Sequence, residues 1–169
     1  MWSVRGAARG VGRIGLARGL STPVTPAPAH LTLMQNMYEK APINGLFNKH
    51  DLVYDEEGNT TLYFTPEDGH CHTMMSLHGA GYFKLLDDAA FFAAQARDPD
   101  HFIFTVSFNT YLVRPVLPGT PLRAKGKVVN SSKSLIIAEA RLEEETTGKL
   151  VASASGTFQK SQHLLSKLK

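Results

Sequence analysis

The segment SLHGAGYFKLLDDAAFFAAQ, residues 76–95, constrains the fold more than any other part of the chain. It reads as a helix, yet it is apolar on nearly every side. Its apolar positions include Phe83, Leu85, Leu86, Ala89, Ala90, Phe92 and Ala93. One wall cannot cover all of them, so we expect a sheet to wrap around this helix, with the alanines allowing a close approach.

β-rich runs lie on both sides of this helix. DLVYDEEGNTTLYFTP, residues 51–66, predicts a hairpin because two β-rich runs flank EEGN. The runs after the helix are FIFTVSFNTYLV, PLRAKGKVV, SLIIAEARLEE and KLVASASGTF, separated by short turns. The order predicts an α+β domain: a short helix at 31–40, a hairpin, a long helix at 79–97, and an antiparallel sheet that curls around the long helix.

The first twenty residues differ in composition from the rest of the chain. They contain no acidic residue and four spaced arginines, Arg5, Arg9, Arg13 and Arg18. This pattern is typical of a mitochondrial presequence, and a disordered basic tail is the alternative. The prolines of STPVTPAPAH then indicate a linker. We expect a targeting segment with linker at 1–30, one domain at 31–160, a polar tail at 161–169, and a mitochondrial location.

Charge, cysteine content and hydropathy limit which partners, cross-links and membrane segments this chain can have. Without residues 1–20 the chain has 14 basic and 15 acidic residues, so its basic balance belongs to the leader and indicates no nucleic-acid surface. Cys71 is the only cysteine, which excludes an internal disulfide. No apolar run reaches the roughly 18–20 residues that a membrane span needs.

Two adjacent carboxylates, Asp87 and Asp88, lie in the middle of the long helix. An unpaired buried carboxylate is costly. Lys84 lies three and four residues before them, at contact spacing, and we expect it to form an exposed pair with Asp88. Because consecutive residues are about 100° apart around a helix, Asp87 points elsewhere.

The start of the helix offers free backbone N–H groups and the positive end of the dipole. Gly79 and Gly81 would let another molecule approach that backbone, which could hold an oxyanion; a plain glycine-rich cap is the alternative. Asp87 lies about 12 Å further along the axis. One helix cannot bring both groups to the same carbonyl, so a catalytic pair would require two antiparallel copies in a symmetric dimer.

Two segments carry a resemblance to a known family. LHGAGYFKLLDDAA resembles the HGG…D segment of hotdog-fold acyl-CoA thioesterases of the phenylacetate-degradation (PaaI-like) type. FNTYLVRPVLPGTPLRAKGKVV resembles the strand–Pro–Gly–strand segment that follows it, and the resemblance covers residues 42–160. It implies a hotdog fold and hydrolysis of a fatty or aryl acyl-CoA. It further implies a homodimer or dimer of dimers, with no metal and no cofactor other than the coenzyme A of the substrate.

The resemblance also implies roles for single residues. Gly79 matches the glycine whose N–H polarises the thioester carbonyl, and Asp87 matches the carboxylate that attacks the thioester or activates water. Thr105 matches a Ser or Thr that orients water, and His72 stands where the family has Asn or Gln. In the family, Gly79 and His72 of one subunit meet Asp87 and Thr105 of the partner subunit. The residues expected beside the substrate are His78, Ala80, Lys133 and Ser134.

The sequence departs from the family pattern at three positions. Ala80 replaces the second glycine of HGG, and Met75 replaces a glycine three residues before the motif histidine. The histidine at position 72 replaces an amide, which affects the expected rate and pH profile more than the fold. His78 itself fits a structural hydrogen-bonding role at the helix start better than the role of a base.

Other interpretations of these segments stay open. HCHTMMSLH could supply zinc ligands from His70, Cys71, His72 and His78, although their spacing is not distinctive. Lys133 with Arg123, Lys125 and Lys127 could contact coenzyme A phosphates or form a solvated strand face. Rival functions are a non-catalytic hotdog module that binds acyl groups or a partner, and a hotdog hydratase, which would need a histidine about five residues from its aspartate.

Overall fold

The computed structural model describes residues 26–47 and 50–167. The helices are α1 (Pro28–Lys40) and α2 (Gly79–Gln95), with short 3-10 turns η1 (Pro42–Leu46), η2 (Asp68–His70) and η3 (Leu165–Lys167). The strands are β1 (His50–Tyr54), β2 (Thr60–Phe64), β3 (His101–Leu112), β4 (Leu122–Ser131), β5 (Leu135–Glu144) and β6 (Leu150–Leu164).

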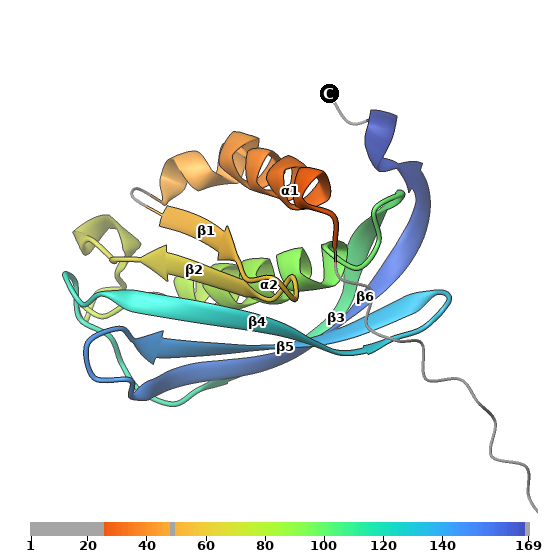
Figure 1. Ribbon diagram of the computed structural model, residues 1–169. Coiled ribbons are helices and arrows are strands. Elements are labelled where there is room, and N and C mark those ends of the chain that lie inside the picture. Colours follow the sequence, from red (N-terminus) through yellow and green to blue (C-terminus); the bar gives the residue numbers. More distant parts are fainter. Residues whose placement is uncertain (1–25, 48–49, 168–169) are drawn as a thin grey trace, which may run out of the picture.

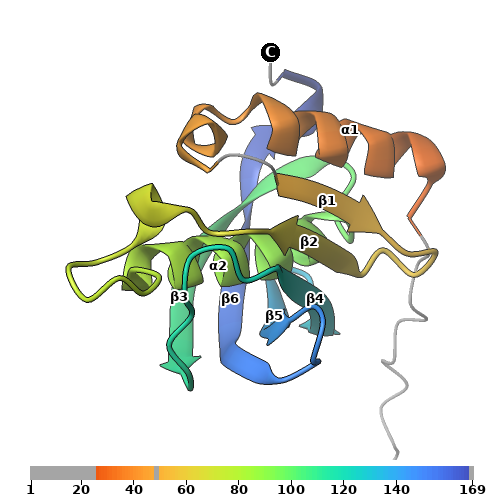
Figure 2. The ribbon, with the colours of Figure 1, turned by 90° about the vertical axis from the view of Figure 1, so that its left-hand side faces the viewer.

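The six strands form one sheet in the order β1-β2-β4-β5-β6-β3, and every neighbouring pair is antiparallel. The sheet curls around α2, and α1 lies above α2 and β1 (Figure 1). After a quarter turn, α2 is again seen inside the curve, between α1 and the strands β3 to β6 (Figure 2). The predicted hotdog architecture, a long helix wrapped by an antiparallel sheet, is confirmed.

The sheet comes very close to α2 at Gly126 of β4. A Cβ placed on Gly126 would lie 1.9 Å from the carbonyl oxygen of Ala89, so only glycine fits there. Next to it, the Thr60 hydroxyl of β2 donates a hydrogen bond of 2.6 Å to the same carbonyl. Ala89 and Ala90 are fully buried. The expectation that small residues bring the sheet close is therefore confirmed, and the contact fixes α2 at the turn that carries the two acids.

The long helix ends two residues earlier than the sequence indicates, at Gln95. The buried Gln95 side chain donates to the carbonyls of Asp98 and His101 and accepts from the N–H of Ile103. A glutamine that bonds the backbone of the next segment fixes the turn from α2 into β3. This turn sets where β3 passes the helix.

Both ends of the domain extend further than expected. The first helix, α1, begins at Pro28, within the predicted linker and before the predicted start at 31. β6 runs to Leu164, past the predicted start of the polar tail at 161, because its last residues pair with the start of β3. Leu165 is buried, and its N–H donates to the carbonyl of Asp100. The predicted targeting segment of residues 1–20 lies outside the described residues.

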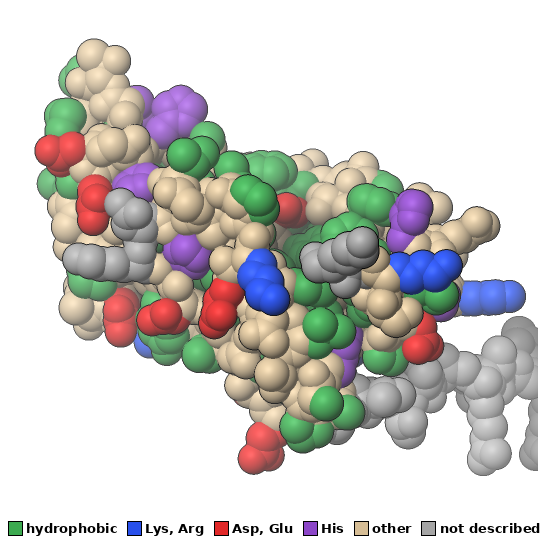
Figure 3. All heavy atoms as spheres, turned by 90° about the horizontal axis from the view of Figure 1, so that it is seen from above, with side chains coloured by type: hydrophobic (Ala, Val, Ile, Leu, Met, Phe, Trp, Pro, Cys, Tyr) green, Lys and Arg blue, Asp and Glu red, His purple; other side chains and the backbone are tan. Residues whose placement is uncertain are grey.

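On the face seen from above, acidic, basic and hydrophobic side chains are interspersed over the part that the structure describes (Figure 3). Within residues 26–47 and 50–167, no helix is long and apolar enough to span a membrane.

Candidate active site

The start of α2 presents a free donor at Gly79. His78 is the N-cap, and its Nδ1 accepts the N–H of Ala80 at 3.0 Å, so the N–H of Ala80 is occupied. Among the hydrogen bonds of the described residues, none uses the N–H of Gly79. A Cβ placed on Gly79 would meet nothing within 4 Å, so the space beside this donor is open. An N–H at the positive end of a helix dipole can stabilise an oxyanion.

Asp87 points from α2 to the edge strand β3. The Thr105 hydroxyl of β3 donates to Asp87 Oδ1 at 3.1 Å, within the same chain. Burial raises the pKa of Asp87 to about 6, although the hydrogen bond from Thr105 opposes that rise. A half-buried carboxylate with such a pKa is ionised at neutral pH and is a better base than an ordinary aspartate.

Asp88 lies on another side of the helix and forms the expected ion pair with Lys84. Lys84 Nζ also donates to Asn44 Oδ1 at 2.7 Å and lies over the rings of Tyr38 and Phe47. The side chains of Lys84 and Asp88 are only 14% and 16% exposed. The pairing is confirmed, but the exposed environment expected for it is wrong, because η1 and α1 cover the pair.

Gly79 and Asp87 do not meet within one chain. Both lie on α2, eight residues apart, and at 1.5 Å per residue the separation along the axis is about 12 Å. β3, which carries Thr105, is the last strand of the sheet, so one of its edges has no strand beside it. Asp87 and Thr105 therefore lie together next to an open sheet edge.

His72 lies in the loop before α2 and is bonded through both ring nitrogens. Its Nδ1 accepts the N–H of Met74 at 3.1 Å, and its Nε2 is 2.8 Å from the Ser76 hydroxyl. Met75, between them, has a φ of 56°, the left-handed region that favours glycine. The family glycine that Met75 replaces would suit this backbone.

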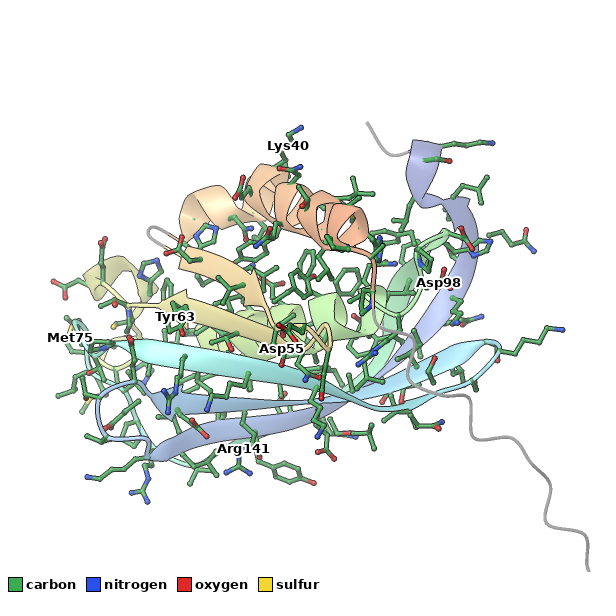
Figure 4. All side chains as sticks on the ribbon, in the orientation of Figure 1. Lys40, Asp55, Tyr63, Met75, Asp98 and Arg141 are labelled. Carbon is green, nitrogen blue, oxygen red and sulfur yellow. The ribbon has the colours of Figure 1, made fainter. Side chains whose placement is uncertain are left out.

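Lys133 and Ser134 lie in the turn between β4 and β5, away from the start of α2. They line an open pocket of about 590 Å³ together with Arg97, Asp98, Pro99, Asp100, His101, Lys160 and Ser161. Met75 of the loop and Asp98 of this pocket lie at opposite ends of the molecule (Figure 4). Within one chain, the structure does not bring Lys133 to Gly79 or His72.

Two of the three basic residues of β4, Arg123 and Lys125, form ion pairs within the sheet, and the third, Lys127, is exposed. Arg123 and Lys125 lie 3.3 Å and 3.2 Å from the carboxylate of Glu143 on β5. These ion pairs lower the pKa of Glu143 even though burial opposes that shift. Because Arg123 and Lys125 are already paired with Glu143, Lys133 and Lys127 are better candidates for a phosphate contact.

The histidine-rich loop does not form a metal centre in the described residues. The Nδ1 atom of His70 accepts the N–H of Glu67, and its Nε2 lies 3.0 Å from the carbonyl oxygen of Leu46. The side chain of His70 does not form a cluster with Cys71, His72 or His78. The grouped His, Cys, Asp and Glu side chains in the described part of the chain are Asp98, Asp100 and His101. Asp98 there already accepts two backbone N–H groups and lies 3.5 Å from Lys160.

Sequence reasoning missed two polar residues: Ser76, in the loop before the helix start, and Asn44, which contacts the ion pair on the other side of α2. Asn44 contacts Lys84 from forty residues away, and no spacing pattern could have revealed it. Ser76 lies four residues from His72, and a polar pair at this spacing in a tight loop was the available signal.

Comparison with known proteins identifies one family model and several solved structures that are similar to this chain. Residues 74–151 match the family model of the thioesterase superfamily. None of the curated proteins matches the chain. Among solved structures, the chain is similar to the E. coli PaaI protein from the phenylacetic acid degradation operon, at 19% identity over 80% of this chain and 95% of that chain, with a TM-score of 0.72.

Two further structures are similar at comparable levels. Thioesterase superfamily member 2 from Mus musculus is 22% identical over 79% of this chain and 98% of that chain, with a TM-score of 0.68. A hypothetical thioesterase protein from Streptococcus pneumoniae, solved with coenzyme A, is 14% identical over 76% and 96%, with a TM-score of 0.67. At these identities the likeness shows a shared fold.

Proposed function

Because residues 74–151 match the thioesterase superfamily model and the chain shares the hotdog fold of similar solved structures, we propose that it is an acyl-CoA thioesterase that releases a fatty or aryl acid and coenzyme A. The observation that carries this proposal is Asp87, a half-buried carboxylate with a raised pKa, held by Thr105 beside the open edge of β3. A buried carboxylate without a cationic partner of its own suits chemistry better than stability.

The proposed reaction uses the ionised form of Asp87. The carboxylate either takes a proton from water, which then adds to the thioester carbonyl, or attacks that carbonyl directly and is released by water. The Gly79 N–H stabilises the negative oxygen that forms. When water is the nucleophile, the C–S bond then breaks, the sulfur takes the proton held by Asp87 and leaves as the thiol of coenzyme A, and the acid is released. When Asp87 is the nucleophile, breaking the C–S bond leaves a mixed anhydride, the thiolate of coenzyme A takes a proton from solvent, and water then hydrolyses the anhydride to release the acid and Asp87. Thr105 orients the carboxylate through its hydroxyl.

The proposed site requires two copies of the chain. Gly79 and Asp87 are about 12 Å apart along one helix, too far to act on one carbonyl. β3 also exposes apolar side chains beside its free edge, and these are Phe104, Val106, Tyr111 and Leu112. A long apolar edge strand needs cover. A symmetric dimer across β3 would cover it and bring Gly79 of one protomer to Asp87 of the partner subunit.

Lys133 and Ser134 are proposed to contact the phosphates of coenzyme A. They lie beside Arg97 and Lys160 in the pocket at the far end of α2. With antiparallel helices in a dimer, this end of one protomer would lie near the helix start of its partner. The solved structure with coenzyme A is a similar fold, which supports a coenzyme A ligand here.

A mitochondrial location remains part of the proposal, supported by the arginine-spaced, acid-free residues 1–20. A full-length tagged protein found in the cytosol with its N-terminus intact would contradict it.

The function is tested by thiol release from a panel of acyl-CoA substrates, followed by a mixing experiment. Gly79 is the first residue of α2, where proline is tolerated, and His78 has the extended backbone (φ −67°, ψ 147°) that proline requires before it. Gly79→Pro therefore removes the donor N–H with little disturbance. Gly79→Ala is the matched control, because its Cβ enters open space and its N–H remains.

Gly79→Pro and Asp87→Ala subunits should each be inactive alone. A mixed dimer has one intact site and one site with both defects, so mixing should restore part of the activity. Well-folded mixed dimers that stay inactive would contradict the shared site. A wild-type protein that hydrolyses no acyl-CoA would favour the non-catalytic hotdog module instead.

A further inference from the structure

The ring of His72 is held in one tautomer by its two neighbours. The Met74 N–H donates to Nδ1 at 3.1 Å, so Nδ1 carries no proton. In the neutral ring the proton therefore lies on Nε2, which is 2.8 Å from the Ser76 hydroxyl oxygen. Nε2–H donates to Ser76, and the only ring proton is thus directed into the loop. This assignment follows from the hydrogen-bond network.

The same geometry excludes a serine nucleophile activated by His72. A general base must offer an unprotonated nitrogen to the hydroxyl. Here Nε2 already holds a proton, and Nδ1 is occupied by the backbone. The pair of His72 and Ser76 cannot act as a base and nucleophile in this arrangement.

The loop that this pair closes leads directly into the helix start. The His72 N–H donates to the Ser76 carbonyl at 2.9 Å, and the Met75 N–H donates to the His72 carbonyl at 2.8 Å. Ser76 is only 9% exposed, while Met75 holds a left-handed backbone. A non-glycine residue in that region is strained and is kept there by its surroundings. Ser76 lies three residues before Gly79.

We propose that His72 is a positioning residue that acts through Ser76: the two side chains lock residues 72–76 and thereby set the position of the Gly79 N–H. The proposal rests on the proposed function for the meaning of that N–H. It differs from the role that the resemblance implies for position 72, where an amide lies near the substrate carbonyl. The lock is built from the histidine ring, whose Nε2 reaches a residue that an asparagine could not reach.

An asparagine at position 72 allows the two hydrogen bonds of the His72 ring, to Met74 and to Ser76, to be tested separately. Asparagine Oδ1 stands where histidine Nδ1 stands, one bond beyond Cγ, and Asn side chains accept the N–H two residues on in Asx-turns. His72→Asn should therefore keep the bond to Met74 and lose only the bond to Ser76. Ser76→Ala removes the same bond from the other side.

The test is a double-mutant cycle of His72→Asn and Ser76→Ala, measured as kcat and KM for an acyl-CoA that the wild type hydrolyses. If the lock acts as a unit, each single variant lowers kcat by about fivefold to tenfold, the rate equivalent of one hydrogen bond, with KM nearly unchanged. The double variant should then be no worse than either single variant. Ser76→Thr keeps the hydroxyl and should retain most of the activity.

Other outcomes would overturn the lock. Losses that multiply in the double variant would show that the two residues act independently. An unchanged or higher rate in His72→Asn, beside a loss in Ser76→Ala, would place position 72 on the substrate itself. Thr147→Ala is the matched control, since it removes a hydroxyl bond of 2.6 Å to Glu144 in the turn between β5 and β6, and should change neither constant.

Melting temperatures of the same variants provide the second readout. The lock predicts equal, non-additive decreases for the two single variants, and additive decreases would contradict it even in a protein without thioesterase activity. A wild type that releases no thiol from any acyl-CoA would refute the proposed function, while the melting cycle would still decide the lock.

Discussion

Asp87 and Asp88 are neighbours in sequence, but they lie in different environments. Asp88 is on the side of α2 that η1 and α1 cover, and it pairs there with Lys84. Asp87 is on the side that faces β3, where its partner is the neutral hydroxyl of Thr105. Asp88 is largely removed from water and Asp87 is half-buried, yet only Asp88 is ion-paired.

The different environments of Asp87 and Asp88 show how one helix accommodates two acids that are partly or largely buried. The attraction of Lys84 offsets part of the desolvation of Asp88, although burial still raises the pKa of Asp88, and the ion pair fixes where α2 lies against α1 and η1. A carboxylate bonded only to a hydroxyl keeps most of the desolvation cost, which appears as a pKa raised to about 6. The first arrangement serves the fold, and the second suits the role of a base that we propose for Asp87 at the sheet edge.

The largest expected effect comes from Asp87→Asn. The substitution nearly preserves size and removes the charge needed for attack or proton abstraction, so the rate of acyl-CoA hydrolysis should fall by about a hundredfold or more. Stability should not decrease, because a poorly compensated buried charge is removed. Hydrolysis and thermal melting measured on the same preparation check both parts. Full activity in this variant would remove Asp87 from the proposed site.

The second prediction concerns Asp88, where the burial of the ion pair predicts a larger loss of stability than an exposed pair would give. Because the pair of Lys84 and Asp88 is largely buried, Lys84→Met should leave an uncompensated carboxylate and destabilise the fold by about 2–3 kcal/mol. Asp88→Asn leaves Lys84 bonded to Asn44 and should cost about 1–2 kcal/mol. Urea unfolding measures both.

Lys40→Met is the control for this pair of variants, since it removes an exposed lysine at the end of α1. Losses of only a few tenths of a kcal/mol in Lys84→Met and Asp88→Asn would mean that the pair behaves as a surface pair.

These two acids also show how far the sequence could predict the structure. Apolar residues around the whole helix and β-rich runs with turn residues between them are local signals, so the wrapped helix and the hairpins were predictable. The pairing of Lys84 with Asp88 followed from helical spacing alone. The cover over that pair was not predictable, because it comes from Asn44 and the rings of Tyr38 and Phe47, which are distant in sequence.

The same limit applies to the site. Asp87 and Gly79 were singled out from the helix itself, and the resemblance supplied their roles and added Thr105. The structure places Asp87 and Thr105 in contact. The orientation of His72 depends on a loop with a left-handed residue, Met75, whose conformation no pattern in HCHTMMSLH reports. Boundaries set by tertiary contacts, such as the end of β6 at Leu164, were also beyond local signals.

The third prediction concerns pH and separates the two carboxylates further. If ionised Asp87 is required, the rate should fall about tenfold per pH unit below pH 6 and level off above it. The folded pKa is raised above its ordinary 3.8, so the folded state holds the proton more tightly than the unfolded state. Stability should therefore increase as pH falls from above 6 towards 4.

Asp87→Asn is the control for the pH prediction. Its stability advantage over the wild type should be largest above pH 6 and disappear below about pH 4, the range in which the wild-type carboxyl is protonated in both states. A difference between the two proteins that does not change with pH would show that the pKa of Asp87 is not raised.

The smallest expected effect comes from Thr105, and it tests how the Thr105 hydroxyl affects the pKa of Asp87. The Thr105 hydrogen bond stabilises the ionised form of Asp87 and lowers its pKa, against the larger effect of burial. Thr105→Val keeps the shape and removes this bond, so the acid limb of the rate profile should move to higher pH by less than about one unit. The rate should then fall a few-fold at pH 6 and change little at pH 8. Thr105→Ser keeps the hydroxyl and should leave the limb in place. An equal loss at every pH in Thr105→Val would show that the hydroxyl acts on water or substrate and not on the ionisation of Asp87.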